Sequence, residues 1–152
     1  MKKCICVLLI LACLMMAGCN FNSHFSSNGL TGAQMEATPQ VGQMMNALAG
    51  RDMDAALKLM HPSVLETDQE RENVKAMLQQ MMDFVDGRQF QNLSQASLNV
   101  NSSTGTAGQI KRESASFQVT LDETTNCYLA VVYLTQNGKT GFVSYQLVLG
   151  VV

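Results

Sequence analysis

The spacing of apolar residues changes once along this chain, at Arg88, and that change most restricts the folds it can adopt. Before Arg88, apolar residues recur at i, i+3, i+4 and i+7, the spacing of an amphipathic helix. After it they alternate with polar residues, the spacing of a half-buried strand. Helices followed by strands in a chain of 152 residues predict one α+β domain rather than alternating βαβ units.

Three helices are expected before Arg88, each with its own start signal. Thr38 precedes a proline, Asp52 is a typical N-cap, and Thr67 opens a capping box with Glu70. Their stop signals are Gly50, the residue before Pro62, and the Asp-Gly pair at 86–87. Their apolar stripes are rich in methionine, which we interpret as core filling, with a permissive pocket as the alternative. The stripe methionines are Met44, Met45, Met53, Met60, Met77, Met81 and Met82.

Four antiparallel strands are expected after Arg88. Alternation marks residues 96–100 and 114–121, and two long apolar runs follow at 127–135 and 140–149. The Ser-, Thr-, Gly- and Asn-rich residues 101–108 are expected to form a loop. Asn-Gly at 137–138 is a strong signal for a two-residue hairpin turn.

A two-residue turn also predicts the hairpin register. Strict alternation from the turn places Tyr128 and Tyr145 on one face, and Tyr133 and Phe142 on the other. Because both faces are at least half apolar, we expect helices to cover one of them. The other would meet a protein partner or a second copy, or would line a pocket. The predicted pairs are Gln136–Lys139, Tyr133–Phe142, Val132–Val143, Ala130–Tyr145 and Tyr128–Leu147.

The N-terminus carries a separate, targeting signal. Lys2 and Lys3 precede an uninterrupted apolar run from Cys4 to Ala17. The run is shorter than the roughly 20 residues of a membrane-spanning helix and has the proportions of a secretory signal peptide. An ordinary secretory signal or an uncleaved anchor is the alternative.

The end of this run, Met-Ala-Gly-Cys at 16–19, resembles the lipobox of bacterial lipoproteins, with Met16 where leucine is usual. The resemblance implies a cleaved signal peptide over 1–18, a lipidated Cys19 and a flexible tether over 19–37. Acyl chains contribute about 0.8 kcal/mol per buried CH₂, so Cys19 would anchor the protein to a membrane without a spanning helix. The expected location is the periplasmic or extracellular side of a bacterial cell envelope, with inner and outer membrane both open.

Cysteine use agrees with a domain that does not depend on disulfides. After removal of residues 1–18 only Cys19 and Cys127 remain, and Cys19 is the expected lipid acceptor. No intrachain disulfide is therefore expected, and Cys127 is interpreted as a small core residue.

Residues 41–60, VGQMMNALAGRDMDAALKLM, resemble the N-terminal helix pair of NTF2-like (cystatin-like) domains. The resemblance implies a cone over residues 38–152, with N-terminal helices packed on a four-stranded, curved antiparallel sheet. The helix-helix-sheet domain of small envelope-assembly lipoproteins is the rival architecture, usually with two helices and three strands. The resemblance is carried by Ala47, Asp52, Ala55, Ala56 and Leu57.

Few side chains in the predicted sheet could perform catalysis. NTF2-like enzymes place an acid or base inside the cone, yet residues 90–109 carry no charge and 125–152 carry only Lys139. His61 is the one acid–base candidate by type, although we favour its interpretation as a residue placed at a helix C-terminus by the dipole. The two histidines and the free cysteine lack metal-ligand spacing, so no metal or cofactor is expected. A net charge of −2 argues against nucleic-acid binding.

Two classes of function stay open. The first, which we favour, is a non-enzymatic binding or assembly module that meets a protein partner or a second copy through the sheet. The second is a small hydrophobic-ligand binder or cone-fold enzyme that uses an interior pocket. The candidate surface residues are His61, Tyr128, Tyr133, Phe142 and Tyr145.

Overall fold

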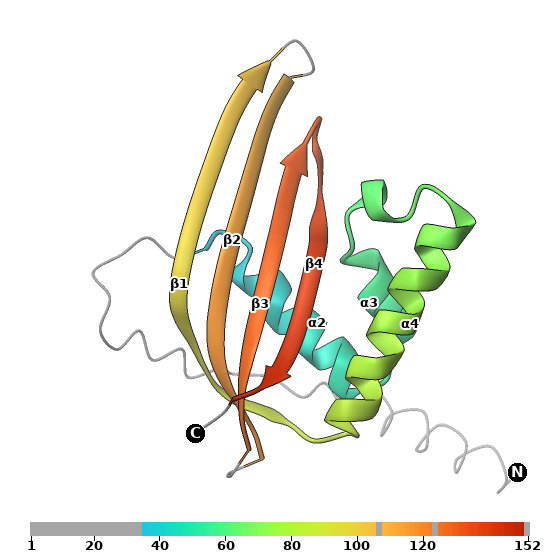
Figure 1. Ribbon diagram of the computed structural model, residues 1–152, viewed down its shortest axis with the longest axis vertical. Coiled ribbons are helices and arrows are strands. Elements are labelled where there is room, and N and C mark those ends of the chain that lie inside the picture. The colour runs from blue at the N-terminus through green and yellow to red at the C-terminus, as the bar shows by residue number, and fades with distance from the viewer. Residues whose placement is uncertain (1–34, 106–107, 123–124, 151–152) are drawn as a thin grey trace, which may run out of the picture.

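The computed structural model describes residues 35–105, 108–122 and 125–150. It confirms the α+β class: helices precede a four-stranded antiparallel sheet whose strands follow chain order, β1-β2-β3-β4 (Figure 1). The predicted signal peptide, Cys19 and the tether up to residue 34 lie outside the described residues. The elements are α2 (Thr38–Ala49), α3 (Met53–Lys58), the 3-10 turn η1 (Pro62–Val64), α4 (Asp68–Val85), β1 (Phe90–Gly105), β2 (Gly108–Leu121), β3 (Thr125–Gln136) and β4 (Lys139–Leu149).

The helix boundaries largely follow the predicted signals. The Asp52 side chain accepts the Ala55 N–H, and Thr67 and Glu70 form the reciprocal capping box. The start of α2 differs, because Ala37 is the N-cap and the Thr38 hydroxyl instead donates to the Met35 carbonyl. The folded body thus begins before residue 38, and both Met35 and Ala37 are buried.

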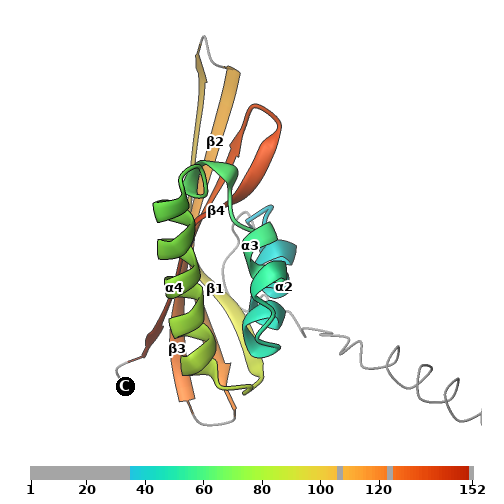
Figure 2. The same ribbon diagram turned by 90° about the vertical axis from the view of Figure 1, so that its right-hand side faces the viewer.

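The strands are longer than predicted. β1 runs over Phe90–Gly105, so the expected loop over 101–105 is wrong: these residues pair with β2 from Asn101↔Arg112 to Gly105↔Gly108. Polar side chains do not prevent pairing here, because the backbone makes the ladder and the side chains of residues 101–104 are exposed on both faces. The segment has the composition of a loop because the sheet there extends past the helices, so its side chains do not enter the core. Both views show this extension (Figures 1 and 2).

The hairpin turn is confirmed, but the register beyond it is not. Gln136 pairs with Lys139 and Tyr133 with Phe142. A bulge then shifts every later pair by one residue, so Val132 pairs with Ser144 and not with Val143. As a result Phe142 and Tyr145 lie on the same side of β4, which strict alternation forbids. The observed later pairs are Val131↔Tyr145, Ala130↔Gln146, Leu129↔Leu147, Tyr128↔Val148 and Cys127↔Leu149.

The core lies between one face of the sheet and the helices, which gather on that side (Figure 2). Alternate residues of β2 and β3, from Ala115 to Leu121 and from Cys127 to Tyr133, point into it. Methionines of the helices, and Met60 just after α3, fill the space opposite: Met44, Met45, Met60, Met81 and Met82 are all buried. The interpretation of the methionine stripes as core is therefore confirmed for these five residues.

Candidate functional site

His61 is held at the start of β4 by backbone pairing. Its N–H donates to the Phe142 carbonyl at 2.9 Å, and the Phe142 N–H donates to the Leu59 carbonyl at 2.8 Å. The His61 ring is buried, and its Nδ1 accepts the Ser63 N–H at 3.1 Å. Its Nε2 is buried without a hydrogen-bond partner among the described residues. In acid–base catalysis Nε2 would be the nitrogen that meets a substrate, and here it is buried.

Three of the predicted surface residues form an aromatic row inside the core. Tyr133 and Phe142 meet edge to face with ring centres 5.0 Å apart, and Phe142 and Tyr145 do the same at 5.1 Å. Burial raises the pKa of Tyr145 well above its usual value, and its hydroxyl donates weakly to the Val41 carbonyl at 3.4 Å. The proposed contact face built on Tyr133 and Phe142 is thus wrong as an exposed surface, because the helices cover it.

Tyr128 lies apart from this row, on the opposite, helix-free face of the sheet. It is 43% exposed and pairs across the sheet with Val148, which is 54% exposed. The predicted site residues therefore separate into a buried group of His61, Tyr133, Phe142 and Tyr145, and one exposed residue, Tyr128.

A hollow of about 470 Å³ surrounds Tyr128 on this outer face. Its exposed wall consists of hydroxyl and amide side chains from three strands, and no charged residue lines it. We call it the outer hollow. Its members on this face are Asn92, Ser94, Gln118, Thr120, Asn126 and Tyr128, with Gly150 beside them.

A second depression, of about 290 Å³, lies between α4 and β4. Its helix wall is mainly apolar, and β4 is an edge strand of the sheet. Among described residues, backbone hydrogen bonds reach the outer edge of β4 only at Phe142, so its second half is an open edge. We call this depression the edge groove; it is lined by Met77, Gln80, Met81, Phe84, Tyr145, Gln146, Leu147 and Val148.

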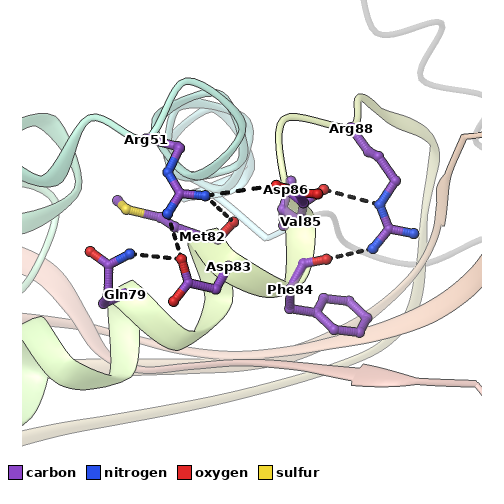
Figure 3. A network of polar contacts seen from close by, with 8 residues as sticks. All are labelled: Arg51, Gln79, Met82, Asp83, Phe84, Val85, Asp86 and Arg88. Carbon is purple, nitrogen blue, oxygen red and sulfur yellow. Dashed lines mark hydrogen bonds and ion pairs between the residues drawn. The ribbon is translucent and has the colours of Figure 1, made fainter.

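A charged network joins the turn between α2 and α3 to the end of α4 (Figure 3). Arg51, at a positive φ of 55°, donates to Asp83 at 2.5 Å and lies 4.0 Å from Asp86. The Arg51 hydrogen bond lowers the pKa of the Asp83 carboxyl. Both carboxylates are thus exposed and paired with Arg51. The network fastens two helices and leads to neither depression.

A second charged cluster fixes the point where the chain enters the body. Glu113 on β2 is buried, accepts the Glu36 N–H at 3.2 Å, and lies 3.5 Å from the Lys111 ammonium. Lys111 also pairs with the Glu36 carboxylate at 2.6 Å, which raises the Lys111 pKa. The sequence analysis did not predict this cluster. The charged residues on β2, in a sheet with few other charges, could have indicated it.

The described residues contain no group of three or more potential metal ligands. Over the same residues, no helix combines the length and apolar character needed to cross a membrane. Comparison of this chain with protein families, curated proteins and solved structures found no match.

Proposed function

We propose that this protein is a lipid-anchored lipoprotein of the bacterial cell envelope, acting as a non-enzymatic binding or assembly module. One observation carries the anchor: residues 16–19 follow a positive region and an apolar run in the order of a lipobox. Diacylglycerol on Cys19 would hold the body at the membrane through the tether. The NTF2-like architecture remains part of the proposal, supported by helices preceding a curved, open sheet.

The edge groove supports the binding role. An unpaired edge strand offers backbone donors and acceptors to an extended peptide, and neighbouring pockets select its side chains. Here Leu147 on β4 lies opposite a wall that includes Met81 and Phe84 on α4. A segment of another protein, extended and apolar at alternate positions, fits this combination.

The enzyme alternative has weaker support. Tyr145 lines the edge groove and His61 has a buried, unpartnered ring nitrogen, but the groove lining does not include His61. Because the two groups do not share a site, proton transfer between a base and a bound ligand has no evident path.

The anchor is tested by Cys19→Ala, with Cys13→Ala as the matched control in the same signal segment. We expect metabolic labelling with a fatty acid to disappear in the first variant and persist in the second. The Cys19→Ala protein should also no longer be recovered among the processed lipoproteins. Equal labelling of both variants would exclude lipidation at Cys19.

The binding role is tested by a photocrosslinking residue at Gln80 in the groove, compared with one at Gln69 near the exposed start of α4. We expect a crosslinked product of defined mass only from position 80, and we expect Leu147→Asp to abolish it. Products that form equally at both positions, or that survive Leu147→Asp, would contradict binding in the edge groove.

A further inference from the structure

The outer hollow has the chemical character of a saccharide site. A β-bulge between Gln91 and Ser94, with Asn92 at a positive φ of 53°, keeps Leu93 in the core while its neighbours face outward. The bulge thereby brings Asn92 and Ser94 to the hollow that Gln118 and Tyr128 also line.

The polar groups of the hollow are available to a ligand. Within the described part of the chain, the side chains of Asn92, Ser94, Gln118, Thr120 and Asn126 make no hydrogen bond to protein. Amides and hydroxyls both donate and accept, as do the hydroxyls of a sugar. No carboxylate, ammonium or guanidinium lines the hollow, so nothing in it selects a charged ligand.

Tyr128 adds the apolar element. Its ring has Gly150 at one side, where an added Cβ would lie 3.3 Å from Cε2, and the rest of the side chain remains substantially open. An aromatic ring presents a flat apolar face with a polar tip, which complements the C–H face of a sugar ring. The volume of about 470 Å³ lies within the roughly 300–1,000 Å³ of small-molecule sites.

We propose that the outer hollow binds an uncharged saccharide, stacked on Tyr128 and hydrogen-bonded by the surrounding amides and hydroxyls. The inference goes beyond the proposed function, because neither Cys19 nor the edge groove takes part in it. An apolar peptide fits this hollow less well, since it would leave most of these polar groups without partners.

The test is calorimetric titration of the purified full chain in detergent with two neutral oligosaccharides, maltohexaose and chitohexaose, and one anionic oligosaccharide, hexagalacturonate. We expect at least one neutral probe to bind with a Kd of about 1 mM or tighter, and the anionic probe to bind more weakly. Tyr128→Ala should weaken binding by about tenfold or more, whereas Tyr128→Phe, which keeps the ring, should retain affinity within about threefold.

A matched pair of glutamines on β2 separates the hollow from its surroundings. Gln118→Leu should weaken binding by about tenfold, and Gln109→Leu, at the exposed far end of β2 and in neither depression, should leave it unchanged. Thermal unfolding of each variant shows whether it is folded. If Tyr128→Ala does not fold, Gln118→Leu supplies the test. Failure of both neutral probes to bind, preference for the anionic probe, or unchanged affinity in Gln118→Leu would overturn the proposal. Each of these results leaves the lipid anchor and the edge groove to their own tests.

Discussion

The backbone of Gly141 lies directly against that of His61. A Cβ added to Gly141 would lie 2.4 Å from the His61 nitrogen and 2.6 Å from its Cα. This approach allows residues 59–61 to pair with β4 through Phe142. A glycine at this position is therefore a requirement of tertiary packing and not of a turn.

Gly141→Ala should consequently destabilise the protein by about 3 kcal/mol, because backbone cannot move aside as a flexible side chain can. Urea unfolding followed by circular dichroism measures the change. Gly42→Ala in α2 is the matched control: nothing lies within 4 Å of its added Cβ, and alanine should stabilise the helix by about 0.5–1 kcal/mol. Equal stability of the two variants would contradict the close approach.

Cys127 should be nearly inert in the folded protein. The residue is 1% exposed, and burial raises the pKa of its thiol, so little reactive thiolate reaches solvent. We expect iodoacetamide at pH 8 to alkylate Cys127 slowly in the folded protein and fast in urea. Mass spectrometry of the Cys127 peptide measures both rates. An engineered exposed thiol, Thr140→Cys, provides the comparison. Alkylation of both at similar rates would show that Cys127 is accessible.

Asp83 should titrate below its ordinary pKa of 3.8, chiefly because Arg51 donates a hydrogen bond to its charged form. Since the folded-state pKa is lowered, the pair stabilises the protein above the unfolded-state value. That contribution is lost as the pH falls through the folded-state value. Carboxyl NMR titration of the wild type and Arg51→Gln measures the shift, with Gln79→Ala as the weaker second perturbation. An unchanged Asp83 pKa in Arg51→Gln would contradict the pairing.

Glu113→Ala should cost about 2 kcal/mol, because the Glu36 N–H and the Lys111 ammonium both lose a partner. Glu36→Gln should cost less than about 1 kcal/mol, because the Glu36 carboxylate is exposed and solvated. Chemical unfolding of both variants measures the difference. Limited proteolysis should also cut earlier near residue 35 in Glu113→Ala than in the wild type. A larger loss from Glu36→Gln would reverse the assigned roles.

The sequence by itself determined the local features of this protein. The helix starts at Asp52 and Thr67 and the Asn-Gly turn depend on residues that are close in the sequence. The order of helices before strands follows from the local spacing of apolar residues. The scarcity of charge over residues 90–109 and 125–150 could be read in the same way. For these features the local preference and the tertiary fold agree.

Only the tertiary structure decided which face of the hairpin is buried. Strict alternation places Phe142 and Tyr145 on opposite faces, but the bulge puts both in the core. There Phe142 pairs with residues 59–61, and Tyr145 reaches Val41, 104 positions away. The helices cover the predicted contact face of Tyr133 and Phe142, and uninterrupted alternation along β3 leaves Tyr128 on the open side. Contacts between residues so far apart in the chain leave no periodic signal, because their gain in free energy exists only once helices and sheet have packed together.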